Sequence, residues 1–250
     1  MALTDNELMR YSRQLLMPAF DVAGQERLKA GKVLVVGAGG LGCPVVLYLA
    51  AAGVGDIRVA DDDTVEIANL QRQIAFRSDD IGRSKAEALA AVASATNPEV
   101  RLTPITDRLD DHSLPAAVEA VDLVIDATDN FDTRFAINRA CVAARTPLVS
   151  GAAIRAEGQV SVFDPRDPGA PCYQCLYSDI GEATLSCSEA GVLGPLVGMI
   201  GTVQAMEAMK LLAHIGTPLT GRLLILDAMT LQWREMRLTQ DPACPVCATR

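Results

Sequence analysis

Two cysteine pairs lie far apart in the sequence, and their spacing is typical of a metal site. Cys172 and Cys175 form one C-x-x-C turn, and Cys244 and Cys247 form another. Because each turn brings two thiolates within reach of one tetrahedral metal, the two turns supply the four sulfurs of a closed structural zinc site. The alternative is two redox or disulfide pairs. We favour it less, since the N-terminal residues show no secretory signal pattern and we therefore expect a reducing compartment. In addition, neither pair follows a thioredoxin-like strand at the start of a helix.

A glycine-rich loop follows the first apolar run and forms a G-x-G-x-x-G motif, whose glycines are Gly37, Gly39, Gly40 and Gly42. Glycines let the backbone come close to phosphate, and the start of the following helix favours negative charge. Asp61 ends the next expected strand, about twenty residues on, where it can accept hydrogen bonds from ribose hydroxyls. The alternative is a glycine-rich turn whose glycines serve only packing. We favour the nucleotide site, because the preceding strand, the glycines and the acidic residue all fit it.

A dense polar cluster after the second expected strand is not typical of a dehydrogenase. It contains Asn69, Arg72 and Gln73, and Arg72 supplies a planar fork suited to phosphate oxygens. Lys85 falls in the first turn of an expected helix, where a cation is poorly placed for the helix dipole unless it shares an anion with the helix start. A solvent-exposed lysine is the alternative that the spacing alone leaves open.

The segment 126–130, with the sequence DATDN, ends a central apolar run. This places it at the carboxyl edge of the expected sheet, where open α/β sheets bind ligands. A carboxylate at this edge can hold Mg²⁺ against a triphosphate. The alternative role is the N-cap of the next helix, and we expect one residue of the segment to serve as that cap.

The elements that position these residues alternate between strands and helices. Apolar runs predict strands at 32–36, 57–60, 101–105, 122–127 and 147–150. Between them, helical patterns cover 42–52, 84–95, 114–120 and 133–144. This β-α-β-α alternation predicts an α/β fold, a Rossmann-like doubly wound and mostly parallel sheet with helices on both faces.

After residue 150 the pattern changes. We expect a long loop over 164–190, a helix over 195–213, and strands at 159–163, 222–226 and 231–238. The first thirty residues predict one or two helices. We therefore divide one continuous fold into a helical arm (1–30), a nucleotide-binding half (31–150) and a zinc-stapled half (151–250).

Composition excludes several classes of protein. Of the 250 residues, 50% are hydrophobic and 21% charged, enough for a large core and too apolar for general disorder. The net charge of −9 and the absence of a Lys/Arg cluster argue against nucleic acid as a partner. The apolar run 190–205 is short and broken by glycines and Pro195, so we expect no membrane span and a cytoplasmic protein. With only His112 and His214 present, histidine catalysis is not expected.

Taken together, these residues resemble the MoeB/ThiF group of ubiquitin-activating-enzyme-like adenylyltransferases. The combination is far more specific than any one motif. The matching pieces run nearly end to end, namely 10–14, 37–42, 61–63, 69–73, Lys85, 128–130, 150–152 and both cysteine pairs.

The resemblance implies an enzyme that uses ATP and Mg²⁺ to activate the C-terminal Gly-Gly carboxylate of a ubiquitin-like sulfur carrier, which the half 151–250 would bind. It implies that Arg13 reaches into the partner subunit's site of a homodimer, that Asp129 holds Mg²⁺, and that the four cysteines hold zinc. The catalytic set would be Arg13, Arg72, Lys85 and Asp129. The nucleotide-binding set would be Gly37, Gly39, Gly40, Gly42, Asp61, Asp63, Asn69, Arg72, Gln73, Lys85, Asp129 and Asn130.

Cys187 matches the position of the family's thioester- or persulfide-forming cysteine. An inert loop thiol is the alternative, because no cation is adjacent in sequence to lower its pKa. The chain ends just after the second cysteine pair, so we expect a separate sulfurtransferase to supply sulfur.

The sequence leaves one preferred function and three alternatives. Segments 150–159 and 227–230 favour a carrier resembling the small MoaD-like subunit of molybdopterin synthase, in molybdenum cofactor biosynthesis. Segments 61–63 and 231–234 favour the ThiS-like carrier of thiamine biosynthesis. An NAD-dependent oxidoreductase would share the glycine loop and Asp61, and a non-catalytic zinc-stapled scaffold would share the cysteines.

Overall fold

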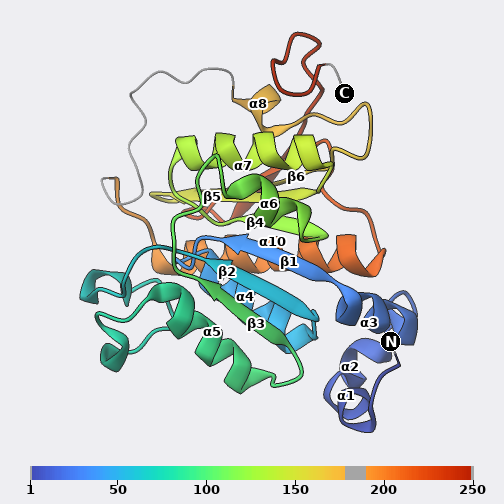
Figure 1. Ribbon diagram of the computed structural model, residues 1–250. Helices are drawn as coiled ribbons and strands as arrows, with labels where there is room; N and C mark the ends of the chain where they lie inside the picture. Colours follow the sequence, from blue (N-terminus) through green and yellow to red (C-terminus); the bar gives the residue numbers. More distant parts are fainter. Residues whose placement is uncertain (1, 178–189, 249–250) are drawn as a thin grey trace.

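One eight-stranded sheet runs through the whole protein, in the order β3-β2-β1-β4-β5-β6-β7-β8 (Figure 1). The computed structural model describes residues 2–177 and 190–248. Neighbouring strands are parallel from β3 to β5 and antiparallel from β5 to β8. The strands are β1 (Lys32–Val36), β2 (Asp56–Ala60), β3 (Arg101–Ile105), β4 (Leu123–Asp126), β5 (Leu148–Ile154), β6 (Glu157–Phe163), β7 (Arg222–Asp227) and β8 (Gln232–Arg237).

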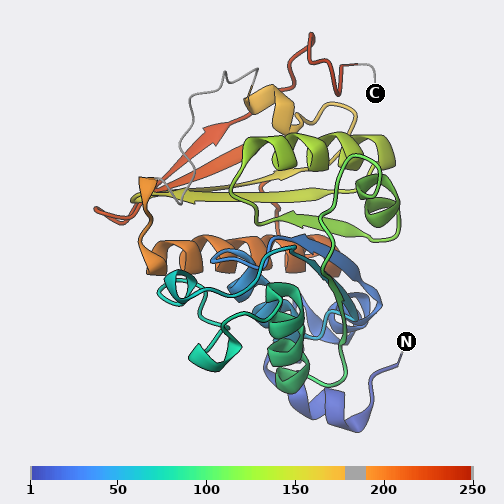
Figure 2. The same cartoon turned by 60° about the vertical axis from the view of Figure 1, so that its left-hand side comes forward.

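Helices cover both faces of this sheet, which confirms the predicted doubly wound α/β class. In Figures 1 and 2, α6 and α7 lie on one face, and α4, α5 and α10 lie on the other. The helices are α1 (Asp5–Arg10), α2 (Ser12–Leu15), α3 (Asp21–Ala30), α4 (Gly42–Ala52), α5 (Lys85–Thr96), α6 (Leu114–Glu119), α7 (Phe131–Ala144), α8 (Tyr173–Leu176) and α10 (Gly194–Ala213), with 3-10 turns η1 (Ile67–Asn69) and η2 (Ser78–Asp80).

The central strands are buried on both faces, which explains why they appear in the sequence as unbroken apolar runs. In β1, Val33 and Val35 join the core beneath α4 and α10, whereas Leu34 and Val36 join the core beneath α6 and α7. All four residues of β4 are buried. The sheet is thereby fixed from both sides, and the loops at its carboxyl edge start from rigid strand ends.

Helix α10 is long and apolar enough to cross a membrane by length and composition alone, but 61% of its most apolar window is buried inside this fold. It packs against α4, β5 and β6. A Cβ on Gly201 would lie 2.5 Å from the carbonyl oxygen of Leu41, so the two helices are in close contact. The helix is therefore a core helix of the sheet layer.

Several boundaries differ from the prediction. The N-terminal arm contains three helices rather than one or two, because the chain leaves the helix at Tyr11 as well as at the turn that contains Pro18, which cannot donate a helical hydrogen bond. Helix α7 begins two residues earlier than predicted, because Asn130 caps it. The long loop expected over 164–190 contains α8. The division at residue 150 falls inside β5, so both halves share one strand.

Candidate functional site

A polar cavity of about 450 Å³ opens at the carboxyl ends of β1, β2 and β4. Between β1 and β4 the strand order reverses, and such a crevice is where open α/β sheets bind ligands. The structure brings most of the predicted nucleotide-binding residues to this one cavity. They are Gly37, Gly39, Gly40, Asp61, Asp63, Asn69, Arg72, Gln73, Lys85, Asp129 and Asn130.

The glycine loop connects β1 to α4, as predicted, and the backbone leaves no room for a side chain at Gly37 and Gly42. Gly37 has a φ of +99°, and a Cβ there would lie 2.6 Å from the carbonyl oxygen of Ala127. Gly42 does not line the cavity; a Cβ on it would lie 1.9 Å from the carbonyl oxygen of Gly37. Gly42 therefore lets the loop turn sharply into the helix, while Gly39 and Gly40 form the cavity wall.

Asp61 fixes this loop. Its Oδ2 accepts a hydrogen bond of 2.7 Å from the Ala38 amide, and its Oδ1 accepts one of 3.0 Å from the Asp63 amide. Burial raises the pKa of Asp61, while these amides and the nearby Lys85 oppose the rise. Asp61 thus shapes the loop as well as facing the cavity, a contribution that the ribose-binding motif does not predict.

The cations of the site are held by groups of the chain itself. Lys85 is the first residue of α5, and its ammonium lies 2.7 Å from Oδ2 of Asp63. Arg72 donates to the carbonyl oxygen of Ala68 at 3.0 Å and also lines the cavity. Both cations therefore border the cavity that the glycine loop lines, where triphosphate oxygens could accept hydrogen bonds from them.

The side-chain amides of Asn69 and Gln73 also line the cavity. Oδ1 of Asn69 accepts a hydrogen bond from the Glu66 amide at 3.0 Å and so caps the turn η1, which gives it a structural role in addition to the predicted one. Gln73 is buried, and its Oε1 has no hydrogen-bond partner within residues 2–177 and 190–248. A buried amide oxygen without a partner is costly, so a bound ligand that donates to it would stabilise the site.

The segment after β4 contributes an exposed carboxylate and a helix cap. Asn130 caps α7 by accepting from the Thr133 amide at 2.9 Å, which confirms that one residue of the segment is an N-cap. Asp129 is exposed and lines the cavity. Its carboxylate forms no ion pair or hydrogen bond with the described part of the chain, so it is free to bind a cation.

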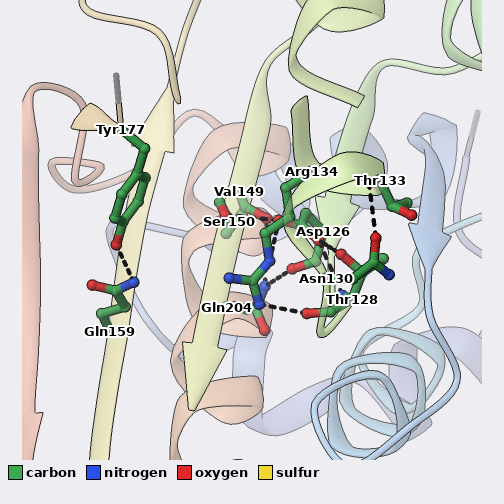
Figure 3. Close-up of polar contacts among 10 residues, drawn as sticks. All are labelled: Asp126, Thr128, Asn130, Thr133, Arg134, Val149, Ser150, Gln159, Tyr177 and Gln204. Carbon is green, nitrogen blue, oxygen red and sulfur yellow. Dashed lines mark hydrogen bonds and ion pairs between the residues drawn. The ribbon is translucent and has the colours of Figure 1, made fainter. Parts of the chain in front are cut away.

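Sequence reasoning missed a buried polar network beneath this segment (Figure 3). Asp126 and Arg134 are both buried, with Arg134 Nε 3.8 Å from Asp126 Oδ2. Ser150 donates to the same carboxylate at 2.9 Å, and Gln204 of α10 donates to the Asp126 carbonyl at 2.7 Å. The available signal was an aspartate directly ending a buried apolar strand, because such a carboxylate needs partners.

The four cysteine sulfurs gather into one cluster, as predicted, all within 4.8 Å of one another. Cys172 lies 3.7 Å from Cys244, and Cys175 lies 3.4 Å from Cys247. A disulfide would place two sulfurs about 2.05 Å apart, whereas four sulfurs at about 2.3 Å from a tetrahedral zinc lie about 3.8 Å apart. The spacing fits zinc and excludes disulfides in this arrangement.

Donors around the cluster also suit thiolates. Asn138 of α7 donates to Cys172 at 3.6 Å, and the Asp241 amide donates to Cys175 at 3.4 Å. Burial raises the pKa of Cys172, and it raises the pKa of Cys175 to about 11. Without a cation Cys172 and Cys175 would hold their protons, so a bound metal is what would keep these two sulfurs ionised.

One residue of the predicted catalytic set, Arg13, is not brought to the cavity. Arg13 is exposed on α2, in the arm that precedes β1 at the amino ends of the parallel strands, and it does not line the cavity of its own chain. Cys187 lies outside the described residues.

The chain was then compared with known proteins. A sequence model of the ThiF family matches residues 11–246. The chain belongs to the ThiF family. Among its relatives in this family, the molybdopterin-synthase adenylyltransferase of Salmonella typhimurium is 49% identical over 245 residues, covering 98% of each chain. The sulfur carrier protein ThiS adenylyltransferase of Escherichia coli is 46% identical over 246 residues, covering 98% of this chain and 97% of that protein.

A solved structure has the same ThiF-type fold. E. coli MccB, crystallised with AMPCPP and selenomethionine-labelled MccA, superposes with a TM-score of 0.84 at 25% identity, covering 95% of this chain and 74% of that chain. The sheet order, glycine loop and cysteine cluster described above are therefore features of a ThiF-family protein with its sheet extended by the antiparallel strands β6–β8.

Proposed function

We propose that this protein is an ATP-dependent adenylyltransferase that activates the C-terminal carboxylate of a ubiquitin-like sulfur carrier. The observation that carries the proposal is the cavity at the carboxyl edge of the sheet. There the glycine loop faces Arg72, Lys85 and the free carboxylate of Asp129. Membership of the ThiF family and the adenylyltransferase names of the most similar relatives support it.

The reaction suits a site without a general base. A C-terminal carboxyl has a pKa of roughly 3.5 and is already an anion at neutral pH. One of its oxygens bonds to the α-phosphorus of ATP as the bond from that phosphorus to the bridging oxygen breaks, giving an acyl adenylate and pyrophosphate. The barrier is the approach of an anion to a polyanion, so charge neutralisation and positioning are what the protein must supply.

Each residue then has a defined task. The loop Gly37–Gly42 offers backbone amides to phosphate, and Arg72 and Lys85 neutralise phosphate oxygens. Asp129 would hold Mg²⁺, since an exposed carboxylate with no other partner is the ligand this ion prefers. When bound, Mg²⁺ supplies further positive charge to the triphosphate. Arg13 would reach the same phosphates from the partner subunit of a homodimer, which would account for its place outside its own chain's cavity.

We propose a MoaD-like subunit of molybdopterin synthase as the native carrier, because the molybdopterin-synthase adenylyltransferase is the more similar relative at 49% identity. The ThiS-like carrier is the second candidate, favoured by the 46% identity of the ThiS adenylyltransferase. We further propose a cytoplasmic location, a structural zinc at the four cysteines, and a separate sulfurtransferase that converts the adenylate to the thiocarboxylate.

The experiment offers each purified carrier with ATP and Mg²⁺ and measures the carrier's mass together with exchange of labelled pyrophosphate into ATP. We expect the mass of an added adenylate on a carrier that ends in Gly-Gly, and no exchange without a carrier. Absence of exchange with every Gly-Gly carrier would favour a scaffold. Tight binding of NAD without binding of ATP would favour an oxidoreductase.

A further inference from the structure

Arg134 is a buried cation that the proposed reaction does not yet use. It lies in the first turns of α7, its side chain is 8% exposed, and it lies above the end of β4 (Figure 3). A charged side chain is buried only where partners compensate for lost hydration. The partners of Arg134 are therefore informative about what this cation does.

Asp126 and Arg134 both bond to Thr128, and the Arg134 guanidinium also lies 5.7 Å from the centroid of the Phe131 ring. Arg134 Nη2 donates to the Thr128 carbonyl at 2.5 Å. Asp126 Oδ1 accepts from the Thr128 amide at 3.0 Å and from its hydroxyl at 2.7 Å. Because Arg134 Nε also lies 3.8 Å from Asp126 Oδ2, the pair holds Thr128 from both of its peptide groups. Three hydrogen bonds from Asp126 and Arg134 therefore restrain the backbone and the hydroxyl of Thr128.

The Thr128 carbonyl belongs to the same planar peptide unit as the amide of Asp129, so fixing this oxygen fixes the plane that leads into Asp129. On the other side, Asn130 is held as the N-cap of α7. The Asp129 side chain itself has no partner among the described residues that would orient it. Its direction into the cavity is therefore set by its backbone alone.

The network is also anchored from the opposite face of the sheet. Gln204 of α10 donates to the carbonyls of Asp126 at 2.7 Å and Val149 at 3.4 Å. A Cβ on Gly151 would lie 2.3 Å from Cδ of Gln204, so glycine is required there to admit the amide. Both helical layers thus hold the same strand end, which makes it a rigid support.

We propose that Arg134 is a positioning residue, which with Asp126 fixes the Thr128–Asp129 peptide and so directs the Asp129 carboxylate at a Mg²⁺ ion bound to the triphosphate. This inference rests on the proposed function. A second reading of the same geometry is that Arg134 only balances the buried charge of Asp126. The two readings differ for Arg134→Lys, which keeps the charge but replaces the guanidinium fork with a single ammonium group.

The test measures equilibrium binding of AMPCPP by calorimetry with and without Mg²⁺. We expect Mg²⁺ to tighten binding to the wild-type protein. Arg134 also lines the cavity, so Arg134→Lys should reduce this magnesium effect about tenfold and change magnesium-free binding by a much smaller factor. Asp129→Asn should abolish the effect, and adding Arg134→Lys to Asp129→Asn should change nothing further. Arg139→Lys, an exposed arginine of the same helix, is the matched control and should behave as wild type.

Thermal unfolding of each variant accompanies the binding measurement. If Arg134→Lys does not fold, Thr128→Val replaces it, because this isosteric change removes only the hydroxyl bond to Asp126 and should also weaken the magnesium effect. A magnesium effect of wild-type size in a folded Arg134→Lys protein would overturn the inference, as would equal weakening with and without Mg²⁺. Failure of the wild-type protein to bind AMPCPP would instead overturn the proposed function, and the inference with it.

Discussion

Lys85 and Asp63 form an ion pair of 2.7 Å in which the cation is buried and the anion is exposed, with side chains 8% and 69% accessible. The pair lies at the wall of the nucleotide cavity. A cation inside such a cavity needs a counter-charge when no phosphate is present, and the exposed Asp63 can supply it and then move away. The pair therefore suggests that Lys85 exchanges Asp63 for a phosphate when nucleotide binds.

Lys85→Met should lower the rate of adenylate formation about a hundredfold or more, because it removes a fixed donor to the phosphates. Asp63→Asn should have a much smaller effect, since it removes only the competing anion. Carrier-dependent pyrophosphate exchange measures both rates. Lys32→Met changes an exposed lysine outside the cavity and serves as the control; a loss in Asp63→Asn as large as in Lys85→Met would refute the exchange.

Asp129→Asn should abolish adenylate formation and leave the fold unchanged, because the carboxylate is exposed and makes no contact within the described chain. The amide cannot neutralise a divalent ion as the carboxylate does. Exchange rates across a magnesium titration, together with thermal unfolding, check both parts. Asp132→Asn, an exposed acid three residues further on, should keep full activity, and a wild-type rate in Asp129→Asn would remove Asp129 from the mechanism.

Features that depend on local spacing were predictable from the sequence. The buried strands β1 and β4 appear as apolar runs, and the C-x-x-C turns and the glycine loop have their geometry encoded within a few residues. The sheet and most of the cavity wall follow from these signals. Family resemblance then supplied the proposed role of Asp129 as a metal ligand, because spacing alone left the segment 126–130 open between metal ligand and helix cap.

Contacts between distant residues were not predictable in this way. Arg134 and Arg139 lie on the same helix, yet one is buried over Asp126 and the other is exposed beside Asp111. Helical periodicity places Arg134 on the buried stripe with Ile137 and Cys141 and leaves Arg139 off it. It does not identify the carboxylate at the end of another strand that compensates for the buried charge of Arg134. The pairing of Lys85 with Asp63 likewise joins the first residue of α5 to the segment after β2, whose approach only the tertiary fold determines.

Asp61 gives the protein a defined response to pH. Burial raises its pKa above the ordinary value of 3.8, so the folded protein binds this proton more tightly than the unfolded chain. Its contribution to the free energy of unfolding is therefore largest below pH 3.8 and is lost as pH rises through the raised value. Relative to wild type, Asp61→Asn should become more stable as pH rises through this window. Urea unfolding at a series of pH values measures the difference, and a difference independent of pH would contradict the assignment.

Cys244→Ala should release the metal and lower the Tm by about 5–10 °C, because three thiolates cannot close a tetrahedral site that joins the tail to α8. Zinc content by atomic emission and a thermal melt measure the two effects. Cys141→Ala removes a buried thiol outside the cluster and should keep the full zinc content. Unchanged zinc in Cys244→Ala would refute the ligand assignment.

Arg13 should act across a homodimer, since it is exposed on α2 and does not line the cavity of its own chain. Arg13→Ala and Asp129→Ala should each be inactive alone. After subunit exchange, a heterodimer of the two variants has one cavity with both defects and one with neither. Random exchange should therefore restore about a quarter of the wild-type activity.

The matched control mixes Lys85→Met with Asp129→Ala. Both residues line the cavity of a single chain, so every cavity of this heterodimer keeps one defect and no activity should return. Recovery in the first mixture but not in the second requires Arg13 to complete the partner's site. If neither mixture recovers although mass spectrometry detects heterodimers, Arg13 acts within its own chain, and the arm must move toward the cavity for the reaction to proceed.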